Sequence, residues 1–214
     1  MMKASKPENE VQRIKVLWQY DVLDTVPEEV FDELTALAAL ICGAPIALIT
    51  LVDEQRQWFK SRTGVSLSET SRDISMCAHA ILQDDLFIVA DATLDPRFKD
   101  NPLVVSSPKI RFYAGVPLAA PGGYVLGTLC VVDTVARQLT DDQKKALRLL
   151  GRHVMTQLEL RRQSREMFQG RDDAAKLKEE LAQAQAELAR LRRSKTSSQA
   201  ARRATSKKSK RVRR

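Results

Sequence analysis

The chain of 214 residues is poor in cysteine and has no long hydrophobic run. Its three cysteines, Cys42, Cys77 and Cys130, form no CxxC pair, and their odd number argues against a disulfide framework. The first ten residues lack the apolar core of a signal peptide, and the longest apolar run, APIALITLV, is too short to span a bilayer. We therefore expect a soluble cytoplasmic protein without a membrane span.

The sequence also lacks the common signatures of catalysis. It has no glycine-rich phosphate loop, no paired glutamates on one helix face and no Ser-His-Asp order. A metal site needs three or four ligands, and beyond Cys77 and His79 the chain offers only the distant His153. These absences favour a protein that is not an enzyme and holds no metal, and they identify no cofactor.

Positive charge is concentrated at the C-terminus. Residues 192–214 hold eleven Lys or Arg and no acidic residue, whereas residues 1–191 carry 24 basic and 27 acidic residues. We expect residues 194–214 to form a disordered basic tail, which would bind DNA, RNA or an anionic membrane surface through its charge. A solubilising extension is the alternative. The candidate nucleic-acid-binding residues are Arg202, Arg203, Lys207, Lys208, Lys210, Arg211, Arg213 and Arg214.

The first half of the chain alternates helical and extended patterns. A capping box of Thr25 and Glu28 and apolar residues at helical spacing predict a helix that ends before Gly43. Next come two strands paired as a hairpin, a polar loop, a short helix, a third strand and a long segment with at most one helical turn. These elements are expected at 46–52, 57–61, 63–75, 76–82, 87–90 and 91–109.

The second half begins with two apolar runs, IRFYAGVPL and GTLCVVD, which predict a hairpin around Gly122 and Gly123. A second capping box, Thr140 with Gln143, predicts a long helix. The apolar stripe of that helix has two possible partners, the domain's own sheet or the same helix of a second subunit. Its members are Leu147, Leu150, Val154 and Leu158.

A heptad pattern follows after an interruption around Gly170. Apolar residues recur at alternating spacings of four and three from Leu177 to Leu191. This is just over two repeats of a coiled coil, and it predicts a homodimer formed through a helix over 161–193.

Six segments carry a family resemblance when they are taken in order. They are ALITLVD, RQWFKS, RDISMCAHAI, DPRFKDNPLV and the two runs of the hairpin. From Ile14 to about Leu160, after a flexible segment 1–13, the chain resembles a GAF domain of the bacterial signalling kind attached to histidine kinases and diguanylate cyclases. The resemblance implies an α+β, PAS-like fold with a central antiparallel sheet flanked by helices. It also implies a sensory or regulatory role, with a small ligand or a kinase or cyclase partner in trans.

Cys77 and His79 are the residues closest to a reactive site. Free methionine-(R)-sulfoxide reductases, which are GAF proteins, carry a cysteine in the corresponding segment, but here the 63–75 loop has no partner cysteine and Cys130 lies inside a strand. Bilin-binding GAF domains attach pigment through a cysteine followed directly by histidine, and here Ala78 intervenes. A thiol redox enzyme of the free methionine-(R)-sulfoxide reductase type that uses Cys77 is the alternative to the regulatory role. For the two residues themselves, the other interpretation is that Cys77 is a small buried hydrophobe and His79 a packing residue.

A ligand face is predicted on the second hairpin. Strand alternation places Arg111 and Tyr113 on one face of the first strand, and Thr128 and Cys130 on one face of the second. A face with this mixture of side chains suits an anionic or aromatic ligand. Alternatively, Arg111 pairs with a carboxylate such as Asp91 or Asp95. Of Trp58 and Phe59, only one side chain can face the core. The full candidate ligand set is Trp58, Cys77, His79, Arg111, Tyr113, Thr128 and Cys130.

Overall fold

A computed structural model describes the backbone of residues 2–211 and the side chains of residues up to 185. The chain divides into two units, residues 1–162 and 163–214. The first unit contains the sheet, and the second consists of the later part of helix α5 (Asp141–Arg211). The side chains of the basic residues predicted to bind nucleic acid, from Arg202 to Arg214, lie outside the described part of the chain, so that binding stays a prediction. The backbone of the tail expected at 194–214 continues α5 as far as Arg211.

The sheet has six antiparallel strands in the order β3-β2-β1-β6-β5-β4. Both predicted hairpins are confirmed, β1 with β2 and β5 with β6. Strand β3 was missed, because its three polar residues show no apolar alternation. The strands are β1 (Ile46–Val52), β2 (Arg56–Thr63), β3 (Glu69–Ser71), β4 (Phe87–Val89), β5 (Phe112–Ala119) and β6 (Val125–Asp133).

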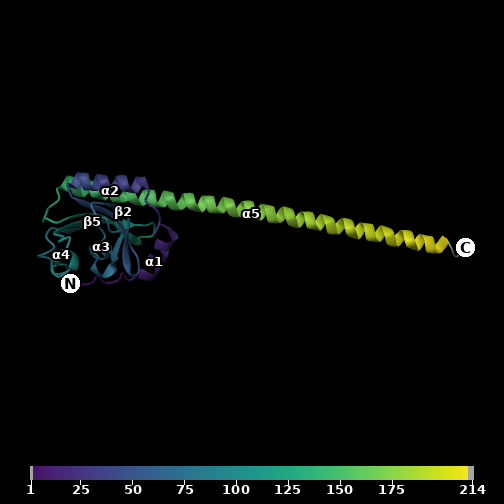
Figure 1. The fold of residues 1–214 in the computed structure, drawn as a ribbon, viewed down its shortest axis with the longest axis horizontal. Coiled ribbons are helices and arrows are strands. Elements are labelled where there is room, and N and C mark those ends of the chain that lie inside the picture. The colour runs from purple at the N-terminus through teal and green to yellow at the C-terminus, as the bar shows by residue number, and fades with distance from the viewer. Residues whose placement is uncertain (1, 212–214) are drawn as a thin grey trace. The chain divides into compact units, whose positions relative to one another are not determined.

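One face of the sheet is covered by helices α1 (Glu10–Gln19), α2 (Glu29–Cys42) and the first part of α5. Figure 1 shows α2 and this part of α5 side by side along the sheet. Leu147, Val154 and Leu158 are buried in that core, so the apolar stripe of α5 packs against the domain's own sheet. Helix α1 was not predicted, and it begins inside the segment expected to be flexible.

Short elements cover the other face. They are a 3₁₀ turn (Arg72–Ile74), helix α3 (Met76–Ala80) and the long segment 91–109 with helix α4 (Pro102–Val105). The predicted short helix and single helical turn are therefore confirmed. Because side chains alternate along a strand, Trp58 joins the helix-covered core and Phe59 joins this second core.

The two predicted capping boxes have different outcomes. At α5 the backbone N–H of Thr140 donates to Gln143 Oε1 at 2.9 Å, and the N–H of Gln143 donates to Thr140 Oγ1 at 3.2 Å. At α2 the prediction was wrong: the Thr25 hydroxyl donates to the Val22 carbonyl, and the Glu28 carboxylate binds a buried lysine instead. An ion pair with the buried Lys60 ammonium is a stronger interaction for the Glu28 carboxylate than a hydrogen bond from a helix N–H.

No helix in the described part of the chain is both long and apolar enough to cross a membrane.

Candidate functional site

A cavity of about 80 Å³ lies between the sheet and the short elements of its second face. One water needs about 10–15 Å³ of such space, so the cavity has room for several waters or a small molecule. Its described lining contains no charged side chain and is mostly aliphatic and aromatic. The lining includes Leu48, Phe59, Val65, Tyr113, Cys130 and Val132.

The lining also contains polar atoms, among them the Thr70 hydroxyl and the Cys77 thiol. The hydroxyl of Thr70, on β3, is buried without a hydrogen-bond partner within the described protein. Cys77, on α3, supplies a thiol from the helical cover. The lining would suit a small uncharged molecule with an apolar body and one hydroxyl or similar group that could pair with Thr70.

A cluster of thiol and hydroxyl groups lies against the cavity. The Cys77 and Cys130 Sγ atoms are 3.8 Å apart, and the Tyr113 hydroxyl donates to Cys77 Sγ at 3.3 Å. Behind them, the Tyr113 and Thr128 hydroxyls are 3.4 Å apart, and those of Thr128 and Thr50 are 3.1 Å apart. The fold thus brings together Cys77, Tyr113, Thr128 and Cys130, four residues of the predicted ligand set.

A glycine on β5 makes this arrangement possible. A Cβ atom at Gly115 would lie only 2.2 Å from the Tyr113 hydroxyl oxygen. Because real Cβ atoms do not approach an oxygen so closely, any other residue would displace the phenol from Cys77. The absence of a side chain at Gly115 therefore leaves the room that the Tyr113 phenol occupies.

The pKa values of the two thiols are shifted in opposite directions. Burial disfavours the Cys77 thiolate, but hydrogen bonds from Cys130, Thr128, Thr50 and Tyr113 outweigh burial and lower the pKa of Cys77. The pKa of Cys130 is raised well above its usual value by its hydrogen bond to Cys77 and by burial. Of the two thiols, Cys77 therefore loses its proton more readily than Cys130 does.

Arg111 does not reach the cavity. Its Nη1 donates to the carbonyls of Val104 at 2.9 Å, Lys109 at 3.2 Å and Ile110 at 3.0 Å. It ties the long segment 91–109 to the sheet, as in the alternative interpretation of Arg111, but through backbone carbonyls instead of Asp91 or Asp95. An anionic ligand would find no cation in the described cavity lining.

Trp58 and His79 also lie away from the cavity. Trp58 packs in the core on the opposite face of the sheet. The His79 ring packs edge-on against Phe98 with centroids 4.8 Å apart, and its Nε2 donates to the Met2 carbonyl at 3.1 Å. Burial lowers the pKa of His79, so it is neutral near pH 7. Within the described residues no group of three or more His, Cys, Asp or Glu is placed to hold a metal ion.

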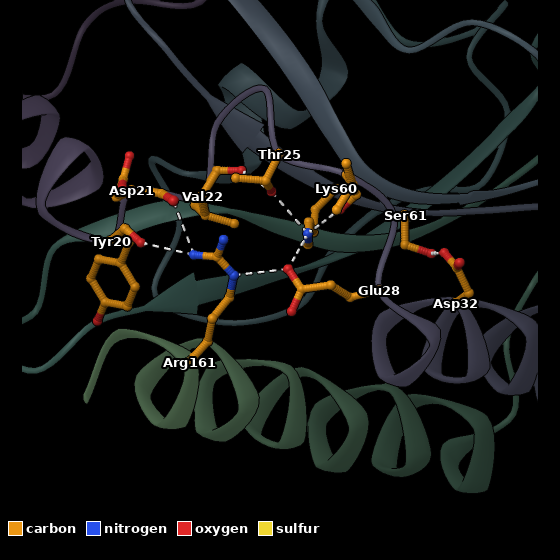
Figure 2. A network of polar contacts seen from close by, with 10 residues as sticks. Tyr20, Asp21, Val22, Thr25, Glu28, Asp32, Lys60, Ser61 and Arg161 are labelled. Atoms are coloured by element: carbon orange, nitrogen blue, oxygen red, sulfur yellow. Dashed lines mark hydrogen bonds and ion pairs between the residues drawn. The ribbon is translucent and has the colours of Figure 1, made fainter. Parts of the chain in front are cut away.

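A polar network that the sequence did not predict lies on the helix-covered side of β2 (Figure 2). The Lys60 side chain is fully buried, and its ammonium donates to Thr25 Oγ1 at 2.9 Å, the Val26 carbonyl at 2.9 Å and Glu28 Oε1 at 2.6 Å. Burial lowers the pKa of Lys60, and Glu28 opposes this by favouring the charged form. The one available signal was a lysine inside an apolar and aromatic run.

The same network fastens α5 to the domain. Arg161, on α5, donates from Nε to Glu28 Oε1 at 2.8 Å, so one carboxylate oxygen serves both cations. Its Nη1 donates to the carbonyls of Tyr20 at 3.2 Å and Asp21 at 3.0 Å (Figure 2). The Tyr20 hydroxyl donates to Glu159, two residues before Arg161 on α5. Lys60 follows the cavity residue Phe59, so neighbouring residues of β2 line the cavity and, through Glu28, connect to Arg161 of α5.

Comparison with known proteins gives matches over this same region. A cyclic di-GMP phosphodiesterase of Pseudomonas aeruginosa is 46% identical over 153 residues, which are 71% of this chain and 26% of the relative. This chain therefore matches about a quarter of that protein's length.

Solved structures with the same fold include two of different function. The GAF domain of a phosphoenolpyruvate-protein phosphotransferase from Coxiella burnetii has a TM-score of 0.55 at 15% identity, covering 73% of this chain and 98% of that one. Free methionine-R-sulfoxide reductase from Neisseria meningitidis has a TM-score of 0.52 at 18% identity, covering 77% and 98%. At these identities the likeness concerns the fold alone. The GAF domain family model matches residues 26–158, and the chain belongs to that family.

Proposed function

We propose that this chain is a non-catalytic sensory GAF module that binds a small, uncharged, mainly apolar molecule and passes its occupancy to α5. The observation that carries the proposal is the cavity between the sheet and α3, whose described lining is apolar and uncharged. A site of this kind binds by excluding water from apolar surface and orients its ligand with one or two polar atoms.

The route from cavity to helix runs through β2. Phe59 lines the cavity, and the next residue, Lys60, holds Glu28, which in turn holds Arg161 on α5. A ligand that shifts Phe59 changes the geometry of this shared carboxylate. Such coupling requires that the ligand bind two arrangements of the network with different affinity.

The output surface is a seam along α5 that pairs with a second copy of the chain. The alternating spacing of the predicted heptads extends toward the N-terminus through positions 174, 170, 167, 163, 160, 156, 153 and 149. Of these positions Leu149, Leu160 and Met167 are large, apolar and exposed, as are Leu177 and Leu181, whereas His153, Thr156 and Gln163 are polar. Gly170 falls on the seam and leaves the helix unbroken.

Charges beside the seam favour parallel helices. In a parallel coiled coil each g position faces the e position of the next heptad on the partner. Glu166 and Asp173 occupy g positions, and Arg171 and Lys178 occupy the e positions that they would face. Opposite signs at both places support an in-register homodimer.

The signalling context comes from the Pseudomonas relative. Its name describes a cyclic di-GMP phosphodiesterase, and the aligned part is a quarter of it. We propose that this GAF module regulates a second-messenger enzyme and does not itself carry out catalysis.

Thermal unfolding with phenol and benzoate tests the ligand site. Phenol is small and neutral and carries one hydroxyl for Thr70, whereas benzoate carries a charge that the described lining does not neutralise. Phenol should raise the melting temperature, since a ligand at ten times its Kd adds about 1.4 kcal/mol. Benzoate should not.

Val65→Phe, which fills the cavity from its rim, should abolish the phenol effect, and Leu40→Phe on the exposed face of α2 should retain it. Equal stabilisation by benzoate, or an undiminished phenol effect in Val65→Phe, would contradict the proposed site.

A further inference from the structure

We propose that Cys77 and Cys130 form a reactive dithiol that organic hydroperoxides or hydrogen peroxide oxidise to an intramolecular disulfide inside the cavity. The proposal does not depend on the ligand proposed above, because it rests on the two thiols and their neighbours. From the sequence alone Cys77 has no resolving thiol, since Cys130 is 53 positions away inside a strand. The fold removes that objection by placing the two Sγ atoms 3.8 Å apart.

The two sulfur atoms are close enough to bond after a small local movement. A disulfide has an S–S distance of about 2.0 Å. Cys130 is fixed, because β6 is paired with β1 on one side and with β5 on the other. Cys77 lies on α3, a five-residue helix at the cavity wall, and this short element supplies the movement.

The neighbouring groups favour Cys77 as the thiol that reacts first. The Tyr113 hydroxyl donates to Cys77 Sγ at 3.3 Å, and a phenol in this position stabilises a sulfur anion. Thr50 and Thr128 add hydroxyl groups on the same side. The thiolate is the form that attacks peroxides.

The chemistry proceeds in two balanced steps. Cys77 Sγ attacks one oxygen of the hydroperoxide, the O–O bond breaks, and the products are a sulfenic acid at Cys77 and the corresponding alcohol or water. The Cys130 thiol then attacks the sulfenic sulfur, an S–S bond forms, the S–O bond breaks, and the hydroxyl leaves as water with the thiol proton. The hydroperoxide is the two-electron oxidant, and a dithiol reductant reverses the change.

The cavity gives a small oxidant access to these buried sulfurs. Both cysteines line it, and its lining also includes Leu67 and Pro108, which are exposed at the surface. Hydrogen peroxide has two heavy atoms and fits a space that holds several waters. The reaction therefore needs no unfolding of the sheet.

Cys42 provides an internal control. It is buried in the core on the opposite face of the sheet, and burial raises the pKa of its thiol to about 11. It does not line the cavity, so the same oxidant should leave it reduced.

Peptide mapping after oxidation tests the proposal directly. Trypsin places the three cysteines in three separate peptides, 16–56, 73–97 and 112–137. The full-length protein is treated with hydrogen peroxide, alkylated with iodoacetamide under denaturing conditions and digested without reductant. We expect peptides 73–97 and 112–137 to appear linked, with loss of two hydrogen atoms, and peptide 16–56 to be alkylated. Dithiothreitol before alkylation should separate the pair.

Variants identify the order of events. Cys42→Ala should form the link as the wild type does. Cys130→Ala should lose it and accumulate a Cys77 sulfenic acid that dimedone traps. Cys77→Ala should leave Cys130 alkylated. Circular dichroism establishes that each variant is folded, and the wild-type map decides the question if a variant does not fold.

Three results would overturn the proposal. They are full alkylation of both cysteines in the peroxide-treated wild type, a link that involves peptide 16–56, and a link between two chains on a non-reducing gel in place of one within a chain.

Discussion

At the scale of single residues, the two groups with the most unusual surroundings are Lys60 and Cys130. Both lie in strands where the sequence pattern indicates only an apolar interior or a solvated charge. Lys60 is buried because its ammonium finds three acceptors, one of them charged. Cys130 matters because α3, more than fifty residues earlier in the chain, packs over it. Both properties depend on contacts between distant segments, and local spacing does not encode them.

Because Lys60 and Arg161 share the Glu28 carboxylate, we expect removal of Glu28 to lower stability more than removal of the Lys60 charge. Glu28→Ala leaves the fully buried Lys60 ammonium without its counter-charge, and breaking a buried pair in this way costs about 3 kcal/mol. Lys60→Met keeps the volume, removes the buried charge and leaves Glu28 paired with Arg161. It should cost about 1 kcal/mol or less, since apolar replacement of buried ions is often nearly neutral.

Urea unfolding of the two variants and the wild type measures this difference. The control is Lys144→Met, which removes an ion pair with the exposed Asp141 and should change stability little. A Lys60→Met variant less stable than Glu28→Ala would contradict the argument.

At the scale of elements, the sequence predicted the two hairpins, α2, α3, the single turn of α4 and the start of α5. These elements carry strong local signals, namely apolar alternation, a capping box or proline breaks. It missed β3, which is polar, and α1, whose exposed Val11 and Trp18 blur its apolar face. Alternation also grouped Tyr113, Thr128 and Cys130 correctly. The predicted ligand set included Trp58, whereas Phe59 lines the cavity, because a two-residue period puts the two side chains on opposite faces without showing which face is which.

Gly151 and Gly170, both within α5, allow the effect of side-chain packing on stability to be measured separately from that of helix propensity. A Cβ atom at Gly151 would lie 2.8 Å from Val116 Cγ1, where the helix packs on β5, whereas Gly170 has nothing within 4 Å. Alanine in either place gains up to about 1 kcal/mol of helix stability. At Gly151 overpacking against a stiff Val side chain costs about 1–3 kcal/mol and should outweigh the gain.

Gly151→Ala should therefore lower the urea midpoint of the domain, and Gly170→Ala should leave it unchanged while raising helicity by circular dichroism. A domain midpoint that rises in Gly151→Ala would show that α5 is less tightly packed than the structure has it.

At the scale of the whole molecule, the chain joins a domain with an apolar cavity to a long helix that carries exposed apolar residues. The sequence indicated both parts, the domain through ordered family segments and the seam through heptads. It left open whether the stripe of α5 packs on its own sheet or on a second subunit. The helix does the first with Leu147, Val154 and Leu158, and offers a different row, which includes Leu149 and Leu160, for the second.

The dimer predicted from that row is tested by placing charge on the seam and beside it. Leu177→Asp with Leu181→Asp puts two carboxylates of each chain into the apolar seam, where desolvation and like-charge repulsion oppose association. Ala175→Asp with Ala182→Asp adds the same charge one heptad apart on positions outside the seam. Light scattering after gel filtration should give a dimer for the wild type and the second variant, and a monomer for the first. Monomeric wild type at micromolar concentration would remove the dimer from the proposed mechanism, and a monomer in both variants would place the interface elsewhere on the helix.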